Sequence, residues 1–245
     1  QPLRHRPRGL SRRDRYRTGQ WAATFSRIDE SNENVRAGMA RMRLKLYAQE
    51  EIRTPRILLM FWDGEDYMKG QNTFRKLILA HYSPQKDGRT VRLPFSFSVH
   101  GTYLFNDTTE KNMVELAAAA AKQFKNIGFE YFWIDAGWYK GGWPSGVGNF
   151  FADPARYPNG LAPVGKAAAE NGFKFLLWIE PERVQSKTQF FEEHSKWLLK
   201  NYSDLDRGLY DLTNVKARAW LTDKITEILD TAGVSIYRQD FNMDP

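Results

Sequence analysis

Apolar and polar residues alternate early in the chain with a period typical of β-strands. Residues 41–47 alternate polar and apolar side chains, which predicts a strand with one face in water. Residues 56–62, after Pro55, form an apolar run that predicts a buried strand. Residues 72–81 predict a short helix, and residues 83–88 a turn-rich linker. We therefore expect residues 21–90 to contain the end of a β-sandwich domain and a linker.

Residues 91–245 change to a repeated strand–helix pattern. Apolar strands are expected at 95–99, 129–134, 173–179 and 234–239. Helices are expected after a capping box at Asp107 and Glu110, at 162–170, at 187–201, and before Gly233, where Leu221, Ile225, Ile228 and Leu229 share one face. Repeated β-α units of this kind predict an α/β fold with a parallel sheet covered by helices.

Acidic residues directly follow three of the predicted strands, namely Asp135, Glu180 and Asp240. A parallel sheet of this kind is either an open doubly wound sheet or a (β/α)8 barrel. Barrel enzymes build their sites at the carboxyl ends of several strands, so the acids favour the barrel. A full barrel needs about 250 residues. Residues 91–245 are therefore expected to be its first half, with four of eight strands.

The strand ends also predict which side chains lie together. Because alternate strand residues point the same way, Arg238, Asp240 and Asn242 share a face. Trp133 likewise shares a face with Asp135, and Trp178 with Glu180. A carboxylate beside an arginine is held in its ionised form and suits a nucleophile, while indole faces suit a sugar ring. Any one acid could merely cap a strand end or pair with an arginine, but three at one edge favour a site.

Four segments carry a resemblance to a known family. They are Phe-Trp-Ile-Asp-Ala-Gly-Trp at 132–138, Arg-Tyr-Pro-Asn-Gly-Leu at 156–161, Leu-Trp-Ile-Glu-Pro-Glu at 177–182 and Tyr-Arg-Gln-Asp-Phe-Asn at 237–242. In this order and spacing they resemble glycoside hydrolase family 36, the family of bacterial α-galactosidases and their relatives. The resemblance covers roughly residues 92–245, and residues 21–82 resemble the last part of the family's N-terminal β-supersandwich.

The resemblance implies a retaining α-glycoside hydrolase, with α-galactosidase as the first expectation. Asp240 falls on the family's nucleophile, which attacks the anomeric carbon and forms a covalent glycosyl-enzyme. The sugar-binding residues that we expect are Trp133, Asp135, Trp178, Glu180, Arg238 and Asn242. The family's general acid/base comes from a later barrel strand, beyond Pro245, so this chain alone is not expected to turn over substrate.

Three positions depart from the family pattern. Arg238 replaces the usual lysine, Ala136 replaces a second consecutive aspartate, and Val99 with His100 occupies a region that often carries tryptophan. The lost carboxylate weakens the case for galactose, because buried sugar hydroxyls need hydrogen-bond partners. The substrate is therefore left open between an α-galactoside, an α-N-acetylgalactosaminide and another α-glycoside. A catalytically silent carbohydrate-binding relative is the main alternative.

Composition limits the other classes of function. Residues 1–20 hold seven arginines and one acid, a net charge of +6 that leaves +1 for the rest of the chain. We expect this basic tail to be disordered. The rest of the chain is nearly neutral and shows no basic face with interleaved aromatic residues, which argues against nucleic-acid binding. The apolar runs are far shorter than the roughly 18 residues of a membrane span. The chain starts with Gln1 and is interpreted as a piece of a longer product, so its localisation is undetermined.

Cofactor and metal sites are not expected. The chain has no cysteine, and its four histidines show no metal-ligand spacing. Asp240 and Asn242 could be metal ligands in a different barrel enzyme, but no third ligand series accompanies them. Residues 160–166 match the start of a phosphate-binding loop, yet Ala167 lacks the hydroxyl that would reach Mg²⁺. A half barrel would leave strand edges unpaired, so the isolated chain is expected to aggregate or to need its other half. Oligomerisation of the full-length protein is left open.

Overall fold

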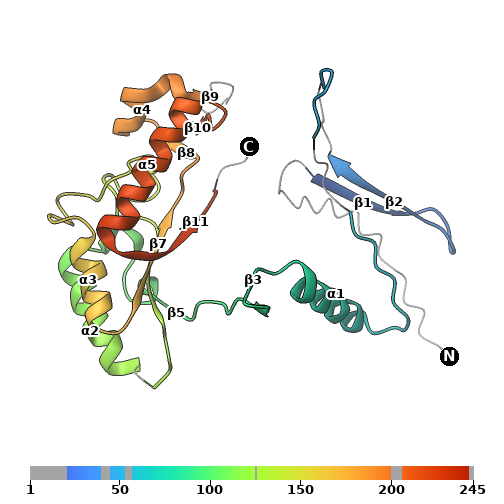
Figure 1. Ribbon diagram of the computed structural model, residues 1–245, viewed down its shortest axis with the longest axis horizontal. Helices are drawn as coiled ribbons and strands as arrows, with labels where there is room; N and C mark the ends of the chain where they lie inside the picture. The colour runs from blue at the N-terminus through green and yellow to red at the C-terminus, as the bar shows by residue number, and fades with distance from the viewer. Residues whose placement is uncertain (1–20, 40–44, 53–56, 125, 200–205, 243–245) are drawn as a thin grey trace. The chain divides into compact units, whose positions relative to one another are not determined.

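The computed structural model describes residues 21–39, 45–52, 57–124, 126–199 and 206–242. The chain divides into two compact units, Gln1–Val91 and Arg92–Pro245 (Figure 1). The predicted basic tail at 1–20 and most of the predicted strand at 41–47 lie outside the described residues.

The described residues of the first unit form two hairpins and one helix. Strands β1 (Trp21–Arg27) and β2 (Glu33–Met39) pair antiparallel, and Asp29 accepts hydrogen bonds from the Ser31 and Asn32 amides in their turn. Helix α1 (Tyr67–His81) confirms the predicted helix and begins five residues earlier, at a cap made by Asp66. Strands β3 (Gln85–Lys86) and β4 (Arg89–Thr90) form a short hairpin that begins in the linker predicted at 83–88 and ends two residues after it.

The buried strand predicted at 56–62 is wrong for the described residues 57–62, which form no strand. Their side chains are largely exposed, and Phe61 reaches 91%. An apolar run becomes a buried strand only when neighbouring strands and a covering layer accept it. No described strand pairs with this segment, and Trp62 packs instead against Gly70 of α1, where an added Cβ would lie 2.6 Å from the indole.

The second unit is built on a four-stranded parallel sheet. Its strands are β5 (Ser96–Ser98), β6 (Tyr131–Ile134), β7 (Lys174–Ile179) and β11 (Val234–Gln239), in the spatial order β11-β7-β6-β5. Each strand pairs in parallel with the one before it in this series, which confirms the predicted α/β alternation. A doubly wound sheet reverses its strand order at a switch point, and these four strands do not. The order agrees with a barrel, while the half barrel and the preceding sandwich stay predictions.

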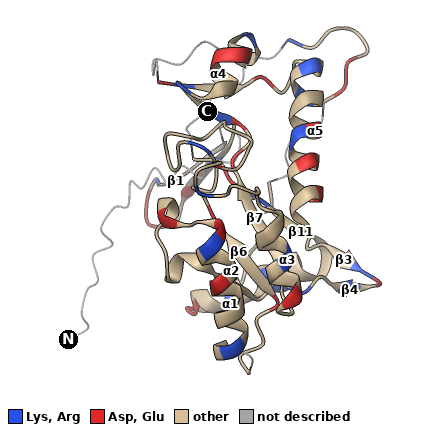
Figure 2. Cartoon of the chain, turned by 90° about the vertical axis from the view of Figure 1, so that its left-hand side faces the viewer, with Lys and Arg blue, Asp and Glu red and all other residues tan. Residues whose placement is uncertain are grey.

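Three helices connect and cover these strands: α2 (Glu110–Phe124), α3 (Ala162–Glu170) and α5 (Val215–Ala232). The bounds of α3 are those that the sequence predicts. Helix α3 approaches α5 closely because Gly165 has no side chain, and a Cβ built there would lie 1.8 Å from the Ala232 carbonyl oxygen. The outer face of α5 carries charges of both signs, as expected of a helix with one face in water (Figure 2).

The capping box predicted for α2 is displaced by two residues. Thr109 and Asn112 make the reciprocal hydrogen bonds, from the Thr109 amide to Asn112 Oδ1 at 2.6 Å and from the Asn112 amide to Thr109 Oγ1 at 3.2 Å. The Glu110 carboxylate instead accepts two hydrogen bonds from Asn159, each 2.9 Å long. The predicted pair and the observed pair are each three residues apart, so spacing alone does not distinguish them. The contact of Glu110 with the distant Asn159 takes Glu110 out of the predicted pair. The short 3-10 helices η1 (Val99–Gly101) and η2 (Phe105–Asp107) precede α2.

The single helix predicted at 187–201 is wrong. Helix α4 (Gln189–His194) stops after six residues and is followed by the 3-10 helix η3 (Ser195–Trp197) and by β9 (Leu198–Leu199). Strands β8 (Arg183–Gln185), β10 (Arg207–Tyr210) and β9 then form an antiparallel sheet that the sequence reading missed. Aromatic packing explains why the helix stops at His194. The His194 ring stacks on Trp197 with centroids 4.3 Å apart, and both rings contact Trp220.

Candidate active site

The three predicted acids follow neighbouring strands of the parallel sheet. Asp135 follows β6, Glu180 follows β7 and Asp240 follows β11. The Asp240 amide donates to the Ile179 carbonyl at 3.1 Å, so the pairing of β11 with β7 continues one residue past the strand end. The acids therefore lie at the same carboxyl edge of the sheet.

Asp240 receives donors on both carboxylate oxygens. Its Oδ2 accepts hydrogen bonds from Trp178 Nε1 at 2.8 Å and from Asn242 Nδ2 at 3.1 Å, and its Oδ1 accepts from the Phe241 amide at 2.9 Å. Burial on its own would raise the pKa of Asp240, but these hydrogen bonds and the charge of Arg238 outweigh it and hold the pKa below its usual value. The carboxylate is thus ionised at neutral pH, and its side chain stays 32% exposed.

Arg238 connects two of the acids. Its Nη1 lies 3.5 Å from Asp135 Oδ2 and 3.5 Å from Asp240 Oδ2. The guanidinium also lies over the Trp133 ring, 5.2 Å from its centroid. The cation therefore offsets the repulsion between two neighbouring carboxylates and joins the ends of β6 and β11.

Glu180 is buried, with 0% of its side chain exposed. Its Oε1 accepts from the Asn242 amide at 2.9 Å, and its Oε2 accepts from Asn242 Nδ2 at 3.2 Å and from Arg183 Nη2 at 2.8 Å. Arg183 is also buried and lies over the Trp143 ring at 4.8 Å. Unlike Asp240, Glu180 has no exposed oxygen for a ligand.

Aromatic side chains continue the site along the sheet edge. Trp178 is contacted edge-on by Trp143 at 5.5 Å, and its carbonyl accepts from Trp138 Nε1 at 2.9 Å. The Trp143 ring contacts Phe105, with centroids 6.1 Å apart, and Phe105 contacts His100, with centroids 4.3 Å apart. Burial lowers the pKa of His100 against the opposing influence of the Tyr103 carbonyl and Asp135.

All seven predicted site residues belong to one connected network. Trp133 and Asp135 join it through Arg238, Trp178 through Asp240, and Glu180 through Asn242. Two further residues of the site, Arg183 and Asn106, are not predicted from the sequence. Asn106 Oδ1 accepts from the Trp143 amide at 2.7 Å, and Asn106 Nδ2 donates to the Trp143 carbonyl at 2.8 Å. Arg183 follows Glu180 by three residues, a spacing that could have flagged the pair, whereas Asn106 had no such signal.

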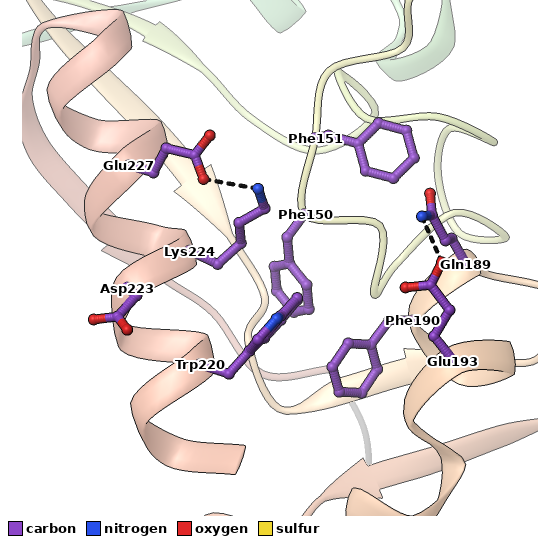
Figure 3. A pocket seen from close by; sticks show the side chains of 9 residues that line it. All are labelled: Phe150, Phe151, Gln189, Phe190, Glu193, Trp220, Asp223, Lys224 and Glu227. Atoms are coloured by element: carbon purple, nitrogen blue, oxygen red, sulfur yellow. Dashed lines mark hydrogen bonds and ion pairs between the residues drawn. The ribbon is translucent and has the colours of Figure 1, made fainter. Parts of the chain in front are cut away.

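A separate hollow of about 470 Å³ lies between the 150–151 loop, α4 and α5 (Figure 3). Figure 3 shows Phe150, Phe190 and Trp220 gathered at one place, with the Lys224–Glu227 ion pair beside them. None of the seven site residues lines this hollow. Within the described ranges, no group of three or more His, Asp or Glu is placed to hold a metal ion, and no helix is long and apolar enough to cross a membrane.

The fold and the site define a parallel-sheet α/β protein with clustered carboxylates and indoles at the carboxyl edge of its strands, as in glycoside hydrolases that work with paired carboxylates. The Melibiase family model matches residues 53–244, and the chain belongs to this family. The predicted resemblance is thereby confirmed.

Curated relatives of the chain are α-galactosidases. The probable α-galactosidase C of Aspergillus flavus is 28% identical over 217 residues, which cover 81% of this chain and 28% of that protein. The α-galactosidase Mel36A of Lactobacillus acidophilus is 26% identical over 206 residues, which cover 81% of this chain and 27% of that protein. The chain therefore spans little more than a quarter of the length of these relatives.

Solved structures share the fold. The family 36 α-galactosidase AgaA from Geobacillus stearothermophilus superimposes with a TM-score of 0.58 at 22% identity, covering 68% of this chain and 23% of AgaA. The galactosidase domain of AgaSK gives a TM-score of 0.56 at 21% identity, covering 66% of this chain and 23% of its own.

Proposed function

We propose that this chain is part of a retaining α-glycoside hydrolase that removes terminal α-galactosyl residues. The observation that carries the proposal is the Asp240 carboxylate, partly exposed and held ionised by Trp178, Asn242 and Arg238. Its neighbours leave Oδ1 with one backbone donor, whereas Oδ2 has three donors around it. Oδ1 is therefore the better-placed nucleophile.

In the proposed reaction, Asp240 Oδ1 attacks the anomeric carbon while the bond to the leaving oxygen breaks. An acid outside the present residues protonates that oxygen, and the sugar stays attached to Asp240 as an ester. The same group, now a base, removes a proton from water, which attacks the anomeric carbon and releases the sugar with its configuration retained.

The surrounding side chains suit a pyranose. Trp133 offers a partly exposed indole surface, Asp135 offers acceptors, and Arg238 offers donors to sugar hydroxyls. Trp178 and Asn242 are predicted to bind sugar as well, but Trp178 is 1% exposed and both Nδ2 hydrogens of Asn242 are taken by Glu180 and Asp240. Variants of AgaA bound raffinose and stachyose, which supports an α-galactoside as substrate. Glu180 is predicted to bind sugar as well, but its burial favours a different role, developed in the next subsection.

The chain is proposed to cover the end of a β-sandwich at 21–90 and the first half of a (β/α)8 barrel at 91–245. The consecutive parallel order of β5, β6, β7 and β11 supports the barrel. The acid/base would then come from a later strand. The family relationship and the length of the relatives both support this arrangement.

Ala136 keeps a second sugar class open. It is 2% exposed and follows Asp135, at a position where the resemblance leads us to expect a second carboxylate. An α-N-acetylgalactosaminide differs from an α-galactoside only at C2, where an acetamido group replaces a hydroxyl, and it stays the alternative substrate class. A substrate panel of aryl α-galactosides and aryl α-N-acetylgalactosaminides decides between the two classes.

The test uses the full-length protein that carries this sequence. With an aryl α-galactoside, NMR should detect the α-anomer of galactose as the first product. Asp240→Asn should abolish turnover, whereas Asp230→Asn, at an exposed position on α5, should not change it. The β-anomer as first product, or an active Asp240→Asn variant, would contradict the mechanism. Tight binding of a galactose-like inhibitor with no turnover of any α-glycoside would instead identify a silent carbohydrate-binding relative.

A further inference from the structure

Glu180 occupies a position in the network that differs from that of the other two acids. Asp135 and Asp240 keep 18% and 32% of their side chains exposed, whereas Glu180 keeps none. Both Glu180 oxygens accept hydrogen bonds from protein donors, three in all. A sugar hydroxyl that replaced one of them would leave a buried donor unpaired, which is costly.

We propose that Glu180 is a positioning residue for Asp240 and that it acts through Asn242. Glu180 holds Asn242 at two points, its amide nitrogen and its Nδ2. The same Nδ2 donates to Asp240 Oδ2 at 3.1 Å. Fixing Asn242 therefore fixes one of the donors that orient the nucleophile. This inference rests on the proposed function, since it names a further residue for the same reaction.

Arg183 connects Glu180 to the second neutral donor of Asp240, which is Trp178. It pairs with Glu180 at 2.8 Å and lies over Trp143. Trp143 contacts Trp178 edge-on, and Trp178 Nε1 donates to Asp240 Oδ2. The buried ion pair thus supports both side-chain hydrogen bonds that Asp240 receives from neutral donors. Preorganised donors of this kind keep a reacting group aligned without reorganisation during the reaction.

The first test is Glu180→Gln in the full-length protein. In either orientation of the new amide, its NH₂ group faces a donor, Arg183 or Asn242, so the fixed arrangement is lost. We expect kcat to fall about 10- to 100-fold with KM nearly unchanged, as for other outer hydrogen-bond partners. A lost direct sugar contact would instead raise KM. Glu182→Gln is the matched control, because Glu182 lies on the same turn and accepts from Gln239 at 3.2 Å without contacting Asp240 or Asn242.

The pH profile provides a second readout. The charged groups around Asp240 are Arg238 on its own strand, Asp135 beyond that arginine, and Glu180 behind Asn242. Asn242→Ala removes a hydrogen bond that lowers the pKa of Asp240 and leaves the charge of the site unchanged, so the acid limb of kcat/KM should move to higher pH in this variant. An unchanged limb together with a raised KM would overturn the positioning role.

A double-mutant cycle guards against a folding defect. Asn242 is exposed, so Asn242→Ala should leave the fold intact, and Glu180→Gln should then have little further effect on kcat in that background. Additive losses would contradict action through Asn242. Carboxyl-¹³C NMR of labelled aspartate, with the Asp240 signal assigned from Asp240→Asn, should show the same upward pKa change without turnover. An inactive wild-type protein would refute the proposed function, whereas an unmoved Asp240 signal would refute the positioning role.

Discussion

Trp178→Phe is the sharpest probe of the proposed nucleophile. The substitution removes the Nε1 donor that lies 2.8 Å from Asp240 Oδ2 and keeps an aromatic ring at a buried position. The Trp178 carbonyl, which accepts from Trp138, belongs to the backbone of β7 and is retained. A hydrogen bond to an ionised group is worth about 1.5–3 kcal/mol. Its loss corresponds to roughly a 10- to 150-fold change in the stability of the ionised form relative to the protonated one.

The direction of the effect follows from the pKa. The Trp178 hydrogen bond lowers the pKa of Asp240, so its removal should raise that pKa. The acid limb of the kcat/KM profile should then move to higher pH, because the free enzyme must be ionised at Asp240 to react. A group with a depressed folded pKa adds stability above its unfolded pKa, and this stability is lost as the pH falls through the folded pKa. Trp178→Phe should therefore also reduce the loss of stability between neutral and acidic pH.

The measurement is the pH dependence of kcat/KM for an aryl α-galactoside with the full-length protein. Trp143→Phe is the comparison for packing: it keeps an aromatic ring against Trp178 and removes no donor to Asp240, so a smaller shift is expected from it. Acid limbs that coincide for wild type and Trp178→Phe would refute the view that this hydrogen bond keeps Asp240 ionised. A shift of equal size in Trp143→Phe would attribute the effect to packing.

Three further predictions concern the fold and the tail. Gly165→Ala should destabilise the full-length protein by about 1–3 kcal/mol or more in urea unfolding, because its Cβ would meet the Ala232 carbonyl. Thr109→Ala should cost about 0.5–2 kcal/mol through the lost N-cap, whereas Asp107→Ala should cost less; the reverse order would support the capping box expected from the sequence. Deletion of residues 1–20 removes seven arginines and should lower retention on a polyanion column only at low salt, whereas a loss of retention that persists at physiological salt would favour a nucleic-acid-binding tail.

The sequence pattern predicts the elements whose ends are set by residues next to them in the chain. The sequence predicts helix α3 with its observed bounds, because Asn171 and Gly172 directly follow its last residue and end the helix. Strands β6, β7 and β11 were predicted within two residues at each end, since each is an apolar run bounded by a turn. The acids at their ends could be found for the same reason: a residue that follows a parallel strand lies at the carboxyl edge.

The features that sequence reading missed depend on distant partners. Residues 56–62 have the composition of a buried strand, but composition does not supply the neighbouring strand. The predicted helix at 187–201 is interrupted because tertiary packing of His194 against Trp197 and Trp220 outweighs helical periodicity. Glu180 was placed on the correct edge, yet its burial depends on Arg183 and Asn242. Position along a strand therefore predicts the neighbourhood of a side chain better than its exposure.

The charge balance of the site explains why three acids can lie so close together. Two guanidiniums, Arg183 and Arg238, accompany the three carboxylates, which leaves one net negative charge. Arg183 neutralises the buried Glu180, where an unpaired charge would be most costly. Arg238 is shared between Asp135 and Asp240, and a planar guanidinium can do this while lying over Trp133 in a way that a lysine ammonium would not. The remaining negative charge is therefore at the exposed pair, where the positive charge of an oxocarbenium-like transition state would develop in the proposed reaction.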